Sequence, residues 1–264
     1  NSTFIKGAAS NTDDAWFGGN TFGNVHITNN SPGGYLRLAN TNGDTFLGTS
    51  TFINNSPDIF DIAYNGNSSF AGQITIDNNA GGTMRFGGTT TQNGTSTLSS
   101  GALTTTNFNS GVLNIRRFTQ TNPVANSTFN PVTFESESSN FQGDFNVNAT
   151  TISFLGGSSF AGNNSFISAG QMNMVTGGNL FSNPGNTTIL TRNGGPAAVV
   201  WGPGNTFGTL VLTDNSAQNL TMQGGNIFGP ATIINNGNKL VRLANTQGDT
   251  FASTSTFINN GTNT

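Results

Sequence analysis

Three acidic residues are spaced as if to meet on neighbouring turns of a repeat. Asp58 and Asp61 are followed by Asp77, and clustered carboxylates of this kind bind calcium or serve the centre of a polysaccharide-cleaving enzyme. The chain holds only 11 acids in 264 residues, and they are spread thinly. We therefore interpret the three as solvated turn residues. A cation held by Asp58, Asp61 and Asp77 is the alternative.

Arg37, Asp61 and Arg85 each lie between two apolar residues. Such alternation places all three on the outer face of short strands. If successive repeats stack in register, Asp61 lies between two arginines, and neighbouring opposite charges contribute about 0.2–1 kcal/mol. An anion-binding stripe is the functional alternative, which Asp61 would neutralise.

Two tryptophans share one local context. Trp16 and Trp201 occur in WFGGNTFG and WGPGNTFG, each six residues before a phenylalanine. An exposed tryptophan could stack on a sugar ring, but the shared repeat position favours packing beside the phenylalanines. His26 is the only histidine, which excludes a histidine metal cluster, and its place between Val25 and Ile27 predicts a surface position.

Asp44 and Asp249 occupy equivalent places, in NGDTF and QGDTF. Because both copies retain the acid, we expect it to accept hydrogen bonds from backbone amides at a corner. A calcium ion would need more oxygen ligands than one acid supplies.

The chain repeats itself, and the repeat must position all these residues. Residues 36–55 and 241–260 match at sixteen of twenty positions after a shift of 205. A finer period recurs within that shift: ten steps lead from Phe22 to Phe251, so the mean step is (251 − 22)/10 = 22.9 residues. A repeat of this length must stack on its copies to bury a core.

Within each repeat a phenylalanine precedes two short strands of alternating apolar and polar residues. Repeat starts are predicted at Phe22, Phe46, Phe70, Leu98, Phe118, Phe141, Phe160, Phe181, Phe207, Phe228 and Phe251. In the Phe118 repeat the apolar positions are Val124, Val132 and Phe134. Alternation over three to five residues is typical of strands with one buried face, so the pattern predicts a parallel β-solenoid.

Composition agrees with such a fold. Only 7% of the residues are charged and 33% are hydrophobic, with 36 glycines and 22 phenylalanines, which favours a thin core over a conventional globule. We expect almost no α-helix. There is no cysteine and no apolar run of eighteen residues, so no membrane span is predicted. The net charge of −3 and scattered basic residues argue against a nucleic-acid partner.

Asparagine pairs follow the first strand of many repeats. They are Asn29-Asn30, Asn54-Asn55, Asn78-Asn79, Asn235-Asn236 and Asn259-Asn260, with Asp214-Asn215 as a near equivalent. Asparagine tolerates tight corners and its amide can bond to the copy above and below, so we expect asparagine ladders. Thr-x-Thr occurs only in isolated repeats, so we expect no continuous threonine row of the kind that would favour ice binding.

The NTF, STF and SFAG motifs before short strands, the asparagine-rich corners, the missing cysteine and the long-range copies resemble the parallel β-helix shafts of large secreted bacterial surface proteins. Autotransporter passengers, haemagglutinin-like adhesins and the giant gliding adhesins of Bacteroidota are of this kind. The resemblance implies an extracellular rod that holds a binding region away from the cell or assembles into a fibre.

We therefore expect an all-β, parallel and right-handed β-helix with coils of about 23 residues, forming a single continuous solenoid over residues 1–264. No polar capping repeat is visible at either end, so we expect a segment of a longer repetitive chain. The predicted function is a structural rod at the cell surface, not an enzyme, without catalytic, cofactor or metal residues. The expected partners are end-to-end stacked repeats of the same kind, with surface glycans as a further partner. The alternative is a carbohydrate-binding or pectate-lyase-like β-helix.

Overall fold

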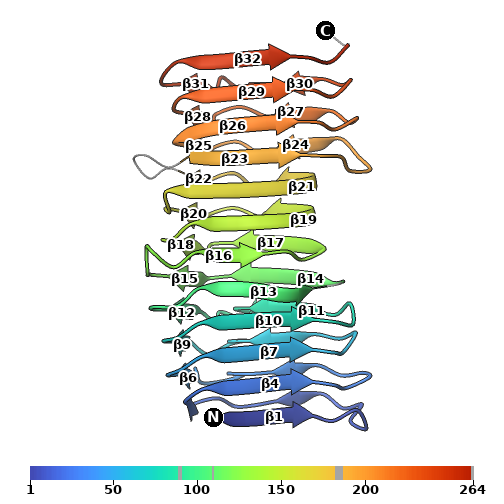
Figure 1. The fold of residues 1–264 in the computed structure, drawn as a ribbon, viewed down its shortest axis with the longest axis vertical. Helices are drawn as coiled ribbons and strands as arrows, with labels where there is room; N and C mark the ends of the chain where they lie inside the picture. The colour runs from blue at the N-terminus through green and yellow to red at the C-terminus, as the bar shows by residue number, and fades with distance from the viewer. Residues whose placement is uncertain (89–90, 109, 182–186, 263–264) are drawn as a thin grey trace. The chain divides into compact units, whose positions relative to one another are not determined.

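The computed structural model describes residues 1–88, 91–108, 110–181 and 187–262. In these residues all regular elements are β-strands, stacked in parallel as a β-solenoid of about 11 turns with a spacing of about 23 residues (Figure 1). The predicted fold class is therefore confirmed. Two compact units divide the chain, Asn1–Glu135 (unit 1) and Ser136–Thr264 (unit 2). A single continuous solenoid over residues 1–264 remains a prediction.

A full coil carries three strands, one on each of three faces that we number 1 to 3 in chain order. In unit 1, face 1 comprises β1 (Ser2–Lys6), β4 (Val25–Asn29), β7 (Ser50–Asn54), β10 (Ile74–Asn78), β13 (Leu103–Phe108) and β16 (Ser127–Phe129). Face 2 comprises β2 (Asp14–Ala15), β5 (Leu36–Arg37), β8 (Phe60–Ile62), β11 (Thr83–Phe86) and β14 (Val112–Arg116). Face 3 comprises β3 (Thr21–Phe22), β6 (Thr45–Phe46), β9 (Ser68–Phe70), β12 (Ser96–Leu98) and β15 (Phe118–Gln120). β17 (Thr133–Glu137) crosses the boundary between the units.

Unit 2 follows the same plan. Face 3 comprises β18 (Asn140–Phe141), β20 (Ser159–Phe160), β22 (Leu180–Phe181), β25 (Thr206–Phe207), β28 (Ile227–Phe228) and β31 (Thr250–Phe251). The long strands β19 (Phe145–Phe154) and β21 (Asn164–Met174) serve both other faces. Later coils separate face 1 (β23, Thr187–Arg192; β26, Thr209–Asp214; β29, Ala231–Asn235; β32, Ser255–Asn259) from face 2 (β24, Val199–Trp201; β27, Leu220–Met222; β30, Val241–Arg242).

Each unit winds in a right-handed sense. In Figure 1 the face 1 strands run from left to right in front, and the chain returns behind them while it climbs toward its C-terminal end. Forward motion in front combined with this climb describes a right-handed helix, as is usual for parallel strands joined by crossovers.

Alternation along the strands separates core from surface, as the sequence predicts. On face 1 of unit 1, Ile27, Phe52 and Ile76 pair in register and are buried, at 1%, 0% and 0% exposure. Their neighbours Thr51 and Thr75 point outward and are partly exposed. A strand of five residues thus gives the core two or three side chains, and only stacking joins these into a continuous core.

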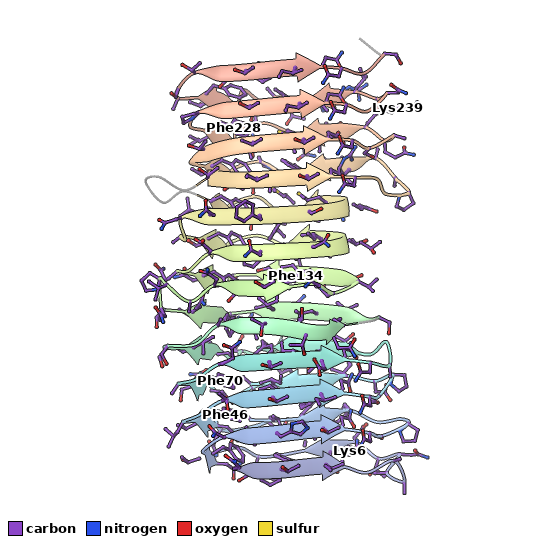
Figure 2. The ribbon with its side chains drawn as sticks, in the orientation of Figure 1. Lys6, Phe46, Phe70, Phe134, Phe228 and Lys239 are labelled. Carbon is purple, nitrogen blue, oxygen red and sulfur yellow. The ribbon has the colours of Figure 1, made fainter. Side chains whose placement is uncertain are left out.

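Phenylalanines stack along face 3. The ring centroids are 5.0 Å apart for Phe22 and Phe46 and 4.5 Å apart for Phe46 and Phe70 (Figure 2). In unit 2 the successive centroid distances are 5.7, 4.6, 5.1, 5.4 and 4.9 Å along Phe141, Phe160, Phe181, Phe207, Phe228 and Phe251. The predicted repeat starts at these positions are confirmed.

One predicted repeat start is wrong. Phe118 pairs with Ser96, whereas Gln120 pairs with Leu98 and so occupies the position that phenylalanine holds elsewhere. Gln120 is fully buried, and its side-chain amide donates a hydrogen bond to the carbonyl oxygen of Ala125 in the following turn. This hydrogen bond takes the place of the ring stacking found in other coils. The repeat assigned from Phe118 also placed Val124 and Val132 in the core, but they are 82% and 38% exposed.

Asparagines form the predicted corner ladders at the ends of the face 1 strands. The inner members are fully buried: Asn29 Nδ2 donates to Asn54 Oδ1 at 3.1 Å, and Asn54 Nδ2 lies 3.4 Å from Asn78 Oδ1. The outer members form a second, exposed ladder, in which Asn55 donates to Asn30 and Asn79 to Asn55, both at 2.7 Å. A primary amide both donates and accepts, so it can bond to a copy of itself on each side.

Two basic residues occupy the same buried corner position, which the sequence did not reveal. Lys6 pairs with Asn29, and its ammonium group donates to the carbonyl oxygens of Thr12, Gly34 and Tyr35 at 2.6, 3.1 and 2.9 Å (Figure 2). In unit 2, Arg192 is fully buried and its Nε lies 2.9 Å from Asp214 Oδ1. Lys6 and Arg192 both donate to carbonyl oxygens of the corner turns. The Asn54 amide donates in the same way to the carbonyl oxygens of Ser56 and Asp58.

Replacing Phe70 by alanine should show that ring stacking stabilises the coils. Phe70 is 1% exposed and stacks on Phe46, so Phe70→Ala should lower the free energy of unfolding by about 3–5 kcal/mol. Urea unfolding followed by circular dichroism measures this change. Phe17 is 74% exposed, so Phe17→Ala is the control and should change the value by no more than about 0.5 kcal/mol. Equal effects of the two substitutions would contradict this assignment of the core.

Candidate functional site

Five side chains on and beside face 2 of unit 1 form what we call the Arg–Tyr cluster: Tyr35, Arg37, Asp61, Tyr64 and Arg85. Three of them come from adjacent strands, since Arg37 of β5 pairs with Asp61 of β8, which pairs with Arg85 of β11. The predicted register around Asp61 is therefore confirmed. All three alternate with buried apolar residues and point away from the core.

Asp61 holds the two arginines. Its Oδ2 accepts from Arg37 Nε at 2.9 Å and its Oδ1 from Arg85 Nε at 2.6 Å. The Asp61 side chain is 0% exposed, whereas those of Arg37 and Arg85 are 21% and 13% exposed. The arginines thus cover the carboxylate. A buried carboxylate with both oxygens paired to charged donors fixes the direction of each guanidinium group.

The two tyrosines orient Arg37 further. The Arg37 guanidinium carbon lies 3.6 Å from the ring centroid of Tyr35 and 4.2 Å from that of Tyr64, so the cation lies over both rings. Arg85 is 6.0 Å from the Tyr64 ring centroid. These are the only two tyrosines in the sequence.

The sequence indicated half of this arrangement. Tyr35 and Arg37 are two residues apart in an extended segment, so they share a face, which the alternation rule would have shown. Tyr64 lies three residues after Asp61 and should have pointed elsewhere. The intervening Ala63 has a φ of 57°, a left-handed conformation that turns the chain and returns Tyr64 to the cluster.

Face 2 of unit 1 continues as a polar column beyond Arg85. Asn114 of β14 pairs with Arg85, and its Nδ2 donates to Glu135 Oε2 at 2.6 Å. The charged members of the Arg–Tyr cluster sum to +1, from two arginines and one aspartate. Glu135, at the far end of the column, is bonded to the Asn114 amide and not to an arginine of the cluster.

The three acids that suggested a metal site have different hydrogen-bond partners. Asp61 has both oxygens on arginines. Asp58 Oδ2 accepts from the backbone amide of Gly34 at 2.5 Å, and Asp77 Oδ1 accepts from the backbone amide of Asn107 at 3.0 Å. Over the described residues, no three His, Cys, Asp or Glu side chains are grouped as metal ligands. Among the described residues, Asp58, Asp61 and Asp77 are therefore not grouped as ligands of one cation.

Asp44 and Asp249 bind backbone amides, as predicted. Asp44 Oδ1 accepts from the Asn20 backbone amide, and Asp249 Oδ1 from that of Asn226, both at 2.9 Å. Asp249 Oδ2 also accepts from the Ala244 backbone amide at 2.9 Å.

Trp201 is a core residue, whereas Trp16 and His26 are partly exposed. Trp201 is 1% exposed and donates its indole N–H to the Met172 carbonyl oxygen at 3.0 Å, which confirms core packing. Trp16 is partly exposed and makes an edge contact with Phe4 at 5.3 Å between ring centroids. His26 is partly exposed, and its Nε2 lies 3.0 Å from Thr28 Oγ1.

Face 1 of unit 1 carries a column of single outward threonines, interrupted by His26, that the sequence did not reveal. Face 1 of unit 1 aligns one outward residue from each of six strands in register: Thr3, His26, Thr51, Thr75, Thr104 and Thr128. Unequal loops hid the column in the sequence, because successive members are 23, 25, 24, 29 and 24 residues apart. In unit 2 the corresponding column contains Ile189, Val211, Thr232 and Thr256. Its first two members are aliphatic and its last two are threonines.

Comparisons with protein-family models, with curated proteins and with solved structures each found no match. The part of the chain that the structure describes contains no helix suited to crossing a membrane.

Removing the carboxylate at the centre of the Arg–Tyr cluster should be costly. Asp61→Ala would leave two partly buried arginines without their counter-charge and should lower the free energy of unfolding by about 3 kcal/mol. Asp77→Ala removes a more exposed acid that accepts hydrogen bonds from Thr106 and Asn107, and should cost only about 1 kcal/mol. Urea titrations of both variants test the difference. A smaller loss for Asp61→Ala than for Asp77→Ala would refute the central role of Asp61.

Proposed function

We propose that this chain is part of a structural rod in an extracellular bacterial surface filament or adhesin. The rod holds a binding region away from the cell or assembles into a fibre. The observation that carries the proposal is that interactions between coils dominate the molecule. Phenylalanine rings, asparagine amides and strand backbones each bond or pack against their equivalents in the next coil. Such a fold grows in length by adding coils, and each added coil needs contact only with its neighbours.

Stacked repeats of the same kind, from this chain or a second copy, are the proposed partners. In unit 1, Phe4 pairs with Ile27 in the core register but is 36% exposed, and it lines a hollow with Trp16 and Phe22. In unit 2, Phe257 pairs with Ile233 and is 54% exposed beside Leu243. An additional coil placed on either strand would cover these side chains and pair the open strand edge.

Cleavage of a polysaccharide is the weaker candidate. It would require acids that are free to transfer protons or bind a cation, and the three best placed by sequence are each committed to separate partners. We therefore assign no catalytic, metal or cofactor residue. The Arg–Tyr cluster supports binding of a glycan without cleavage.

Immunogold electron microscopy of intact cells that produce the protein tests the proposed rod. Antibodies against residues 1–264 should label extended structures outside the cell without permeabilisation, because an extracellular rod exposes its faces to them. An antibody against a cytoplasmic protein is the control and should give no label on intact cells. Label that appears only after permeabilisation would contradict the proposal.

A further inference from the structure

The Arg–Tyr cluster presents hydrogen-bond donors that the protein leaves open. Asp61 takes only the Nε–H groups of Arg37 and Arg85. Over the described residues, no protein acceptor bonds the Nη atoms of either arginine, and none bonds the hydroxyl groups of Tyr35 or Tyr64. Both tyrosines are partly exposed, so solvent reaches the edge of the cluster.

We propose that the Arg–Tyr cluster binds an acidic polysaccharide through its sugar carboxylates. Arg37 and Arg85 supply the charge and the Nη donors, and Tyr35 and Tyr64 supply ring edges and hydroxyl groups beside the sugar. This inference does not depend on the proposed rod, since either could hold without the other.

The arginines are pre-organised for a carboxylate. The planar fork of a guanidinium group matches the two oxygens of a carboxylate, whereas an ammonium group acts only as a point charge. Asp61 and the two tyrosine rings already fix Arg37, so binding costs little side-chain entropy. The strands of Arg37 and Arg85 are about 9.6 Å apart along unit 1, and both side chains turn toward Asp61 between them, so one extended chain could place carboxylates on both.

Tyrosine favours a sugar over a simple anion. A phenol offers an apolar ring and a polar tip, which suits a ligand whose rings carry both C–H groups and hydroxyls. Two nearby negative charges oppose the binding of an anion. Asp13 accepts a hydrogen bond from the backbone amide of Tyr35, and Asp58 accepts one from that of Gly34. They weaken the attraction for an anion without occupying the Nη donors.

The duplicated segment supplies a matched control. Arg242 is the copy of Arg37 after the shift of 205 residues. It pairs with Thr221 rather than with an aspartate, is exposed, and has Leu240 where Arg37 has Tyr35. Arg242 thus has the same sequence context but lacks the partners that would orient it.

Isothermal titration of the full chain with tetramannuronate, at low ionic strength, tests the site. Mannotetraose of the same linkage is the uncharged ligand control because it carries a hydroxymethyl group in place of each carboxylate. The unaltered protein should bind the acidic tetramer and not the neutral one. Arg37→Gln and Arg85→Gln should each weaken binding about tenfold or more, the loss expected for one charge-assisted contact, and Arg242→Gln should leave it unchanged. Arg37→Lys keeps a cation beside Asp61 but lacks the planar fork, so it should still weaken binding. This variant replaces Arg37→Gln in the test if Arg37→Gln does not fold.

Four results would overturn the proposal. One is no binding of the acidic tetramer at millimolar concentration. Another is equal binding of both tetramers, which would assign the contact to general sugar stacking. The third is equal weakening by Arg37→Gln and Arg242→Gln, which would assign it to net charge alone. Tighter binding of a single-stranded oligonucleotide than of the tetramer would also count against a saccharide site.

Discussion

In-register stacking is the constraint on which the rest of this structure depends. Every position in a coil lies about 4.8 Å from its equivalent in the next, so each side chain must be compatible with its own neighbour in the column. Phenylalanine rings stack on phenylalanine, as in Phe46 and Phe70, and amides bond to amides, as in Asn55 and Asn79. Like charges repel at this distance, which accounts for a chain in which only 7% of residues are charged.

In two columns, opposite charges lie on neighbouring coils. Arg37, Asp61 and Arg85 alternate in sign along face 2 of unit 1. Arg192 and Asp214 alternate at the corner of unit 2 and are followed by Asn235. The same rule makes Asp61 important for stability and leaves the outer atoms of the arginines available for other contacts.

Contacts between residues at a constant sequence spacing could be predicted from the sequence. Contacts that depend on a variable spacing or on an unusual backbone conformation could not. Arg37, Asp61 and Arg85 are 24 residues apart, so their contact followed from the period. The register after Leu98 shifts by two residues, which moved Phe118 out of the phenylalanine column. Unequal loops hid the threonine column, since Thr75 and Thr104 are 29 residues apart. Tyr64 reached the Arg–Tyr cluster only through the left-handed Ala63, a conformation that residue types alone do not specify.

Engineered disulfides test the stacking register most directly, because the chain has no cysteine of its own. Thr51 and Thr75 are outward partners on adjacent coils, and strand spacing places their Cα atoms about 4.8 Å apart, within the range that a disulfide bridges. Thr51 and Thr104 are two coils apart, at about 9.6 Å, beyond that range. Mild oxidation should therefore cross-link the variant Thr51→Cys/Thr75→Cys within one chain and leave Thr51→Cys/Thr104→Cys reduced. Efficient closure of the second pair but not the first would contradict the register and, with it, the columns on which this account is built.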